Sequence, residues 1–335
     1  MNTETLRLGS RRSPMAISQS GDVARLVTER TGRPVEIVGV TTLGDVSNEH
    51  MTQIGGTGVF VSALRESLLR GEVDFAVHSL KDLPTGAAPG ITLAAIPARD
   101  DPRDALVGRD GAKLADLPSG ARIGTGSPRR AAQVAVLRSD VTCVPIRGNA
   151  NTRLAKVRDG ELDAVVLAYA GLARIGHTDL VTEIFEPDDM VPAPGQGALA
   201  VECRSDDAEL AGLLAAIDHQ ATRAAVTAER SLLAALEAGC SAPVGAYAIG
   251  QAGTRLLRLH AVVMMAPGGT TPRTSRTPPG MSDAKARMSD MPMVVRERGE
   301  ADAADAARLG SELAARMLDL GAADLMSANT DREDA

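Results

Sequence analysis

Two breaks in the apolar pattern of this chain carry the residues best suited to bind anions. Each combines a short apolar run, small residues, adjacent arginines and a Ser-Pro pair, at 7–14 and 122–130. Glycine lets backbone approach a ligand, and a Ser cap followed by Pro starts a helix whose free N–H groups attract anions. The two breaks therefore predict two anion-binding sites.

Arginines recur at other predicted strand ends and helix starts, as in the segment 147–153, where a Gly turn is flanked by arginines. The planar guanidinium fork binds carboxylates with two hydrogen bonds. Each of these arginines, taken alone, is also compatible with an ordinary solvated surface residue. Taken together they predict a pocket for a small polyanion, and its members are Arg11, Arg129, Arg130, Arg147, Arg153 and Arg174.

An acid/base candidate follows a buried strand pattern in the segment 77–84. Polar groups at the carboxyl end of a strand lie where open α/β sheets bind ligands. Asp82, beside Lys81, is the best candidate for an acid/base carboxylate, although the segment also fits an ordinary solvated turn. We interpret His78 as a strand-end residue rather than a catalyst.

The three cysteines differ in their surroundings, and neither a disulfide framework nor a metal site is indicated. Cys143 and Cys203 lie in apolar strand patterns typical of inert buried thiols. Cys240 lies among Gly, Ser and Pro, which predicts an accessible loop. A reactive thiolate there needs positive charge that the local sequence does not supply.

Composition narrows the class of protein. The net charge of −7 and the aromatic content of 1% disfavour a nucleic-acid binder, so the arginines are interpreted as a local pocket. The N-terminal residues have no apolar run of signal-peptide length, and nowhere do about 18 apolar residues follow one another. We expect a soluble, cytoplasmic protein.

Strand and helix patterns alternate, which predicts an α/β protein built from parallel units. The predicted strands are 6–9, 35–40, 73–78, 91–96, 123–125, 142–146, 164–168, 198–202, 244–249 and 256–263. The predicted helices are 13–30, 58–70, 127–137, 152–158, 208–217, 221–237 and 303–320.

The segment 159–166 repeats the residue pattern of the segment 70–77, which suggests that one unit is duplicated. The polar or Pro/Gly-rich segments 99–104 and 190–197 bracket the second copy, as linkers do. We expect domain 1 to comprise 1–98 and 198–217, and domain 2 to be inserted as 99–197. Domain 3 is expected at 218–335, with a flexible insertion at 267–292 that lacks an apolar period.

These motifs together resemble the porphobilinogen deaminase family, also called hydroxymethylbilane synthases, over nearly the whole chain. The segments that carry the resemblance are Gly9–Pro14, Gly55–Phe60, Val77–Pro84, Asp101–Ala105, Gly124–Arg130, Arg147–Arg153, Gly195–Gly197 and Glu237–Pro243. The family fold implies two hinged periplasmic-binding-protein-like domains and a third domain that bears a cysteine.

The resemblance implies a transferase that joins four porphobilinogen molecules head to tail and releases ammonia from each. The product, hydroxymethylbilane, is a linear tetrapyrrole of haem biosynthesis. The chain grows on a dipyrromethane cofactor held by a thioether to Cys240, and Asp82 matches the catalytic carboxylate. We expect a monomer that binds neither nucleic acid nor membrane.

The resemblance also assigns the pocket residues. Positions that bind cofactor or substrate carboxylates are matched by Arg11, Ser13, Ser79, Lys81, Thr125, Ser127, Arg129, Arg130, Arg147, Arg153 and Arg174. Phe60 matches an aromatic near the pyrrole rings, but it also fits a core residue on a helix face. Thr57 and Leu43 stand where many members have lysine and arginine, which weakens the role expected of the Gly-rich loop and of Asp45.

Two other classes of protein compete with this interpretation. A solute-binding or effector-sensing module shares the hinged architecture, and fold alone does not separate the two. Such a module has no use for a third domain that bears a cysteine. A cysteine acyl-transfer enzyme needs a histidine base, and none of the five histidines lies in a comparable loop motif.

Overall fold

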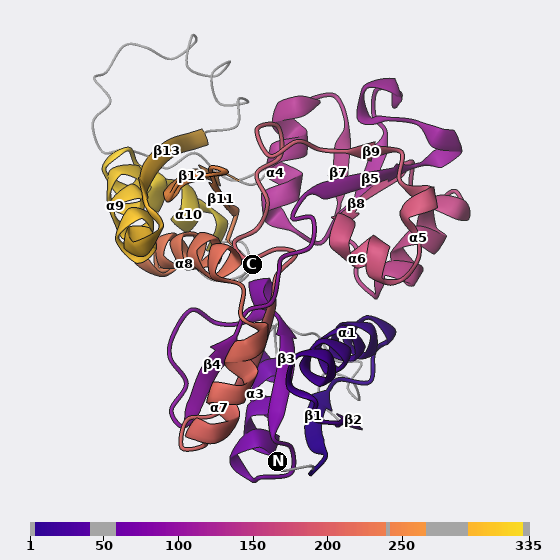
Figure 1. Cartoon of the computed structure of the whole chain (residues 1–335). Coiled ribbons are helices and arrows are strands. Elements are labelled where there is room, and N and C mark those ends of the chain that lie inside the picture. Colours follow the sequence, from indigo (N-terminus) through magenta and orange to yellow (C-terminus); the bar gives the residue numbers. More distant parts are fainter. Residues whose placement is uncertain (1–3, 41–57, 239–241, 266–293, 331–335) are drawn as a thin grey trace.

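The computed structural model describes residues 4–40, 58–238, 242–265 and 294–330, and it has three lobes, each built on its own sheet (Figure 1). Lobe 1 has the strand order β2-β1-β3-β10-β4, lobe 2 has β7-β6-β8-β5-β9, and lobe 3 has β11-β12-β13. The predicted class, an α/β protein with two lobes and a small third domain, is confirmed.

Lobe 1 begins at the first Ser-Pro break. Ser13 caps the following helix by accepting a hydrogen bond from the Ala16 amide at 3.3 Å, and Gly32 ends it in the left-handed region. Helices cover the sheet, whose inner residues are apolar. Its elements are β1 (Leu6–Ser10), α1 (Pro14–Thr31), β2 (Val35–Gly39), α3 (Gly58–Leu69), β3 (Phe75–Ser79), β4 (Ile91–Ala95), β10 (Leu199–Arg204) and α7 (Ala208–Leu214).

Lobe 2 repeats this plan with the second Ser-Pro break. Ser127 caps its helix by accepting from the Arg130 amide at 3.4 Å. The elements of lobe 2 are β5 (Asp104–Gly108), β6 (Arg122–Gly124), α4 (Pro128–Leu137), β7 (Thr142–Val144), α5 (Ala150–Arg158), β8 (Ala164–Ala168), α6 (Tyr169–Arg174) and β9 (Glu183–Ile184).

The two similar segments, 70–77 and 159–166, occupy equivalent places in lobes 1 and 2. Gly71 and Gly160 both have positive φ, and an aspartate lies three residues after each of them. Asp74 accepts from the backbone amide of Arg7 at 2.7 Å, and Asp163 accepts from that of Arg122 at 2.8 Å. The two aspartates therefore fix the start of the neighbouring strand in the same way, as a duplicated unit requires.

The expected parallel units are present, but each of the two large sheets also contains one antiparallel strand. β1, β2 and β3 are parallel, as are β6, β7 and β8, but β10 is antiparallel to β3 and β4, and β5 is antiparallel to β8 and β9. Each antiparallel strand is the one that the chain adds to a sheet as it crosses between lobes. The direction of a strand is set by the path of that crossing, which local sequence does not encode.

The two crossing segments lie side by side, joined by a hydrogen bond from the Asp100 amide to the Gly197 carbonyl at 3.2 Å. The segment 99–104 was predicted to be a linker, but its last residue, Asp104, is buried and starts β5. Because β5 starts with a charged residue, a search for apolar runs did not predict this strand.

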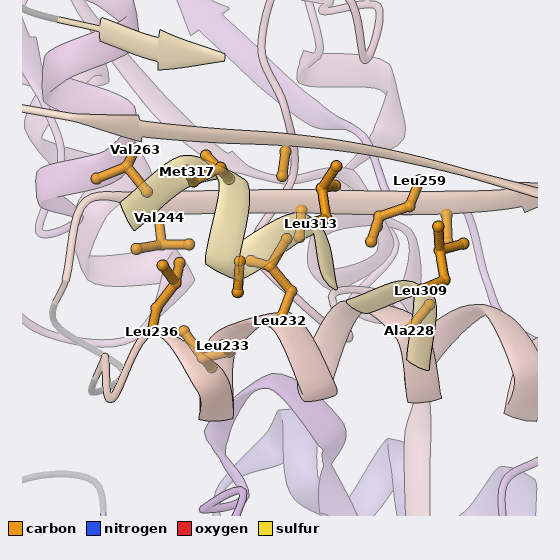
Figure 2. Packing of buried hydrophobic residues seen from close by; sticks show 14 of the residues in the cluster. Ala228, Leu232, Leu233, Leu236, Val244, Leu259, Val263, Leu309, Leu313 and Met317 are labelled. Carbon is orange, nitrogen blue, oxygen red and sulfur yellow. The ribbon is translucent and has the colours of Figure 1, made fainter. Parts of the chain in front are cut away.

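Lobe 3 packs helices on one face of its sheet. Leu232, Leu313 and Met317 meet beneath the strand residues Leu259 and Val263 (Figure 2). A Cβ at Gly310 would lie 2.2 Å from the Ala228 carbonyl oxygen, so glycine allows α8 and α9 to approach closely. The elements are α8 (Gln220–Ala235), β11 (Val244–Gly250), β12 (Leu256–Met264), β13 (Val294–Asp302), α9 (Ala306–Asp319) and α10 (Ala322–Thr330). The sequence did not predict β13.

Within the described ranges, no helix is long and apolar enough to cross a membrane. The insertion at 267–292 lies outside those ranges, as do Leu43, Asp45 and Thr57.

Candidate active site

The predicted acid/base carboxylate lies in a short turn at the carboxyl end of β3. A 3₁₀ helix, η1 (Leu80–Asp82), follows Ser79 directly, and its first residue is fully buried. The Leu80 amide donates to the Ala198 carbonyl at 3.0 Å, which ties the turn to the second crossing segment. Lys81 is half-buried and Asp82 is exposed, so this carboxylate is accessible to a ligand.

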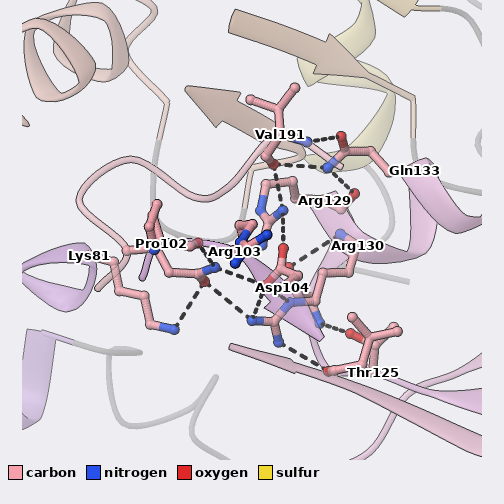
Figure 3. Close-up of polar contacts among 12 residues, drawn as sticks. Lys81, Pro102, Arg103, Asp104, Thr125, Arg129, Arg130, Gln133 and Val191 are labelled. Atoms are coloured by element: carbon pink, nitrogen blue, oxygen red, sulfur yellow. Dashed lines mark hydrogen bonds and ion pairs between the residues drawn. The ribbon is translucent and has the colours of Figure 1, made fainter. Parts of the chain in front are cut away.

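Across the crossing segments, Asp104 lies buried between two arginines of lobe 2 (Figure 3). Its two carboxylate oxygens lie 2.8 Å from Arg129 Nη1 and 2.8 Å from Arg130 Nη2. Arg129 and Arg130 expose only 3% and 6% of their surface. These arginines therefore already hold an internal carboxylate, a partner that the sequence analysis did not foresee.

Gln196 joins lobe 1 to this ion pair. It donates from Nε2 to Asp104 Oδ1 at 2.8 Å, while its Oε1 accepts from Lys81 Nζ at 3.4 Å and from Arg130 Nη2 at 3.3 Å. The side chain on the turn of lobe 1 and the arginines of lobe 2 therefore meet at a single amide of the crossing segment.

The electrostatics of the cluster show an excess of cations. Burial and the charges of Arg130 and Arg129 lower the pKa of Lys81 to about 8, although Asp82 and Asp104 act in the opposite direction. Burial and the charge of Arg130 likewise lower the pKa of Arg153. In both groups burial, which disfavours the charged form, is the largest cause of the shift. A ligand carboxylate nearby would favour the charged form again.

Burial alone would raise the pKa of Asp104, but Arg129 and Arg130 outweigh it and hold that pKa well below its usual range. Asp104 is therefore ionised, and it cancels one of the cationic charges around it. Among the described residues, the cluster holds four cations in all, Lys81, Arg129, Arg130 and Arg153, together with the carboxylates of Asp104 and Asp82.

The remaining predicted arginines occupy different positions. Arg174 is ion-paired with Asp100 and donates to the Gly197 carbonyl at 3.2 Å, so it braces the two crossing segments. Arg153 donates from Nε to the Gly148 carbonyl at 2.9 Å. Arg147 is exposed on the turn before α5, and Arg11 is half-buried after β1.

The predicted hydroxyl groups make backbone and local contacts. Ser13 and Ser127 act as helix caps, and Thr125 accepts from the Ser127 amide at 3.2 Å. Ser79 accepts from Gln19 Nε2 at 2.8 Å. These serines and Thr125 lie at the same strand ends as the cations, while part of their hydrogen-bonding capacity is already used.

Two predicted residues are not placed by the structure. Cys240 lies outside the described residues, and Phe60 lies in α3 with its side chain outside the description. The other two cysteines fit the inert interpretation, because burial raises the pKa of Cys143 and of Cys203 to about 11.

Sequence reasoning missed a second buried carboxylate, Glu229 of α8, which joins lobe 3 to both crossing segments. Its oxygens lie 2.6 and 3.1 Å from the guanidinium of Arg99 and accept from the amides of Gly195 and Ala248 at 2.7 and 2.8 Å. In the sequence, Glu229 stands within a predicted helix, and an isolated glutamate in a helix is usually interpreted as a solvated residue. Asp104 and Gln196 had a stronger signal, since both lie in segments that carry the family resemblance.

Comparison with known proteins identifies the family. The family model for "Porphobilinogen deaminase, dipyromethane cofactor binding domain" matches residues 6–212, and the model for the family's C-terminal domain matches 223–278. A solved structure, the periplasmic VFT2 domain of Bordetella pertussis BvgS, is similar over 64% of this chain and 86% of its own, with 18% identity and a TM-score of 0.40. That likeness is too distant to support an assignment.

Full-length relatives agree with the family models. A porphobilinogen deaminase of Thermobifida fusca is 62% identical over 280 residues, which are 83% of this chain and 87% of the relative. Porphobilinogen deaminase 1 of Streptomyces coelicolor is 57% identical over 334 residues, covering 97% of this chain and 98% of the relative. On this evidence the chain belongs to the porphobilinogen deaminase family.

Proposed function

We propose that this chain deaminates porphobilinogen and joins four molecules head to tail into hydroxymethylbilane, with Asp82 as the catalytic carboxylate and Cys240 as the cofactor anchor. The observation that carries the proposal is the contact of Lys81, the neighbour of Asp82, with Gln196, which also binds Arg130 and Asp104 of the buried ion pair. This whole cluster lies within the residues that the cofactor-binding family model matches.

The described residues suit a dipyrromethane cofactor, whose acetate and propionate groups make it a polyanion. The cluster contains Lys81, Arg129, Arg130 and Arg153, and burial lowers the pKa of Lys81 and of Arg153, so a bound carboxylate would stabilise their charged forms. When bound, the cofactor supplies the pyrrole carbon at which chain growth starts. Lys81, Arg130 and Arg153 would hold its carboxylates and those of the substrate.

Asp82 would act on the substrate. When the aminomethyl carbon of porphobilinogen loses ammonia, the pyrrole becomes an electron-poor azafulvene cation. An exposed carboxylate near the pyrrole N–H stabilises that cation and accepts a proton as the ring is joined to the growing chain. The turn after β3 offers this carboxylate at the edge of the cationic cluster.

The remaining assignments belong to the same proposal. Arg11, Arg147, Arg174, Ser13, Ser79, Thr125, Ser127 and Phe60 would contact the cofactor or the growing chain. We propose the domain boundaries 1–98 with 198–217, 99–197 and 218–335, and the strands of the three sheets support this division. We also propose a cytoplasmic monomer that binds no nucleic acid.

The experiment that tests the proposal is intact mass of the purified protein followed by peptide mapping. The protein should be heavier than its sequence by one dipyrromethane group, and the modified peptide should contain Cys240 rather than Cys143 or Cys203. An unmodified Cys240 in protein that consumes porphobilinogen would contradict the anchor assignment. Absence of porphobilinogen consumption by modified protein would contradict the activity, and a solute-binding module would then be the better interpretation.

A further inference from the structure

One arginine of lobe 3 contacts the backbone of the turn that carries Asp82. Arg230, on α8, donates from Nη1 to the carbonyls of Leu80 and Leu83, at 3.3 and 2.8 Å. Its Nη2 donates to the Pro84 carbonyl at 2.7 Å. A single guanidinium therefore binds carbonyls on both sides of Lys81 and Asp82 in the sequence.

Apolar packing also joins the turn that carries Asp82 to α8. Val226, one helical turn before Arg230, is fully buried and belongs to the same core cluster as Leu80 and Leu83. Residues four apart share one face of a helix, so α8 presents both contacts together. The turn is thus packed and hydrogen-bonded against lobe 3, although it belongs to lobe 1.

The carbonyls at the end of a short 3₁₀ helix are poorly satisfied within the helix itself. From within the helix and its cap, the Leu80 carbonyl accepts one hydrogen bond, from the Leu83 amide at 3.1 Å, and this bond closes a single turn. The guanidinium group presents several donors in a rigid plane, so it can hold three carbonyls at fixed relative positions. A flexible point charge could not reproduce that pattern.

We propose that Arg230 is a positioning residue for the reaction: it fixes the backbone from Leu80 to Pro84 and thereby holds Asp82 in place at the cationic cluster. The inference rests on the proposed catalytic role of Asp82. Asp82 is exposed and receives little packing of its own, so the turn must supply its precision. A displacement of about 1 Å at a reacting group costs roughly 100-fold in rate.

The test compares two arginines of α8 in the cofactor-loaded enzyme. In Arg230→Leu we expect kcat for porphobilinogen consumption to fall roughly 10- to 100-fold, with KM changed less than about threefold. The matched control is Arg223→Leu, because Arg223 also joins α8 to lobe 1: it donates to the Ala94 carbonyl at 3.2 Å, and it pairs with Asp218, just before α8, at 2.8 Å. Its kcat should stay within about twofold of the wild-type value.

Two further measurements separate positioning from a general loss of structure. Arg230→Lys should recover only part of kcat, and Arg230→Ala should gain activity when millimolar guanidinium ion is added, while Arg223→Ala should not. Cofactor loading is checked by intact mass, and all rates are expressed per loaded enzyme. A kcat for Arg230→Leu equal to that of Arg223→Leu, an effect on KM alone, or no response to guanidinium would overturn the inference.

Asp82→Asn distinguishes this inference from the proposed function. If Arg230 acts through Asp82, the double variant Asp82→Asn with Arg230→Leu should be little slower than Asp82→Asn alone. Multiplied losses would overturn the positioning role but leave Asp82 in the mechanism. Near-normal turnover of Asp82→Asn would overturn both assignments.

Discussion

Lobes 1 and 2 share one strand order but place different chemistry at the ends of equivalent strands. After β3, the chain forms the polar turn that exposes Asp82, whereas after β8 it enters α6 at once with Tyr169 and Ala170. Only lobe 1 thus offers an accessible carboxylate at this position. In the function we propose, one copy of the duplicated unit supplies the proton-transfer group and the other holds the charges of the ligand.

A second comparison concerns the strand that enters each large sheet directly after the chain has crossed from the other lobe. Both β5 and β10 contribute a buried carboxylate, Asp104 in lobe 2 and Glu202 in lobe 1. Glu202 accepts from Arg65 at 2.7 and 2.9 Å and lies 3.3 Å from His78 Nε2, which together hold its pKa at about 2 despite burial. Arg65 is less buried than Arg129 and Arg130, so water can solvate its guanidinium group. The charges of Arg129 and Arg130 therefore depend more on Asp104 than the charge of Arg65 depends on Glu202.

The largest effect should follow from Asp104→Ala, which leaves two buried arginines without their carboxylate. We expect a loss of about 3–5 kcal/mol in the free energy of unfolding, because an uncompensated buried charge is costly. Glu202→Ala should cost less, since Arg65 can reach water. Urea denaturation gives the values, with exposed Asp22→Ala as the control, expected within about 0.5 kcal/mol of wild type. Equal losses at Asp104 and Asp22 would refute the buried pair.

Next in size is Asp82→Asn, which keeps the shape of the side chain but removes the charge. We expect turnover of porphobilinogen to fall about 100-fold or more while the fold and cofactor loading survive. The control is Asp206→Asn, whose side chain is 86% exposed in the same lobe. If both variants consume substrate at similar rates, Asp82 has no special role and the contrast between β3 and β8 loses its functional meaning.

A third prediction separates two arginines of lobe 2. Arg147→Leu should weaken cofactor assembly or chain elongation by about 1.5–3 kcal/mol, the value of a charge-assisted hydrogen bond, without loss of stability. Arg129→Leu should also lower stability, because Arg129 holds Asp104. Lysine should restore only part of either effect, because a point charge cannot reproduce the guanidinium fork.

Native mass of enzyme-bound intermediates and urea unfolding measure these two effects separately. Arg273→Leu, in the predicted insertion, should leave activity unchanged. If all three substitutions have equal effects on elongation, overall charge rather than a built pocket governs binding.

The smallest effect concerns pH. Burial and the neighbouring arginines lower the pKa of Lys81 to about 8, so Lys81 is charged below that pH and neutral above it. Carboxylate binding should therefore weaken as pH rises, and kcat/KM should fall a few-fold between about pH 7 and pH 9. Lys81→Arg remains charged and should lack this step. A wild-type profile that is flat across pH 8 would contradict the prediction.

Local sequence predicted most elements well. Ser13 and Ser127 cap the helices predicted from Ser-Pro pairs, and the strand 164–168 has the predicted bounds. These features depend on side chains and backbone groups within a few residues, so they can be read from the chain directly. The family motifs likewise identified Asp82 and the arginines as site candidates before any contact was known.

Tertiary structure alone decided how those residues are used. Whether Arg129 binds a ligand or an internal carboxylate depends on Asp104, which arrives from a different strand, and both cases look identical in sequence. The antiparallel insertion of β5 and β10 depends on the path between lobes. The support of the Asp82 turn by Arg230 joins residues about 150 positions apart. Charge pairing and burial are set by distant partners, and no local pattern records which partner will arrive.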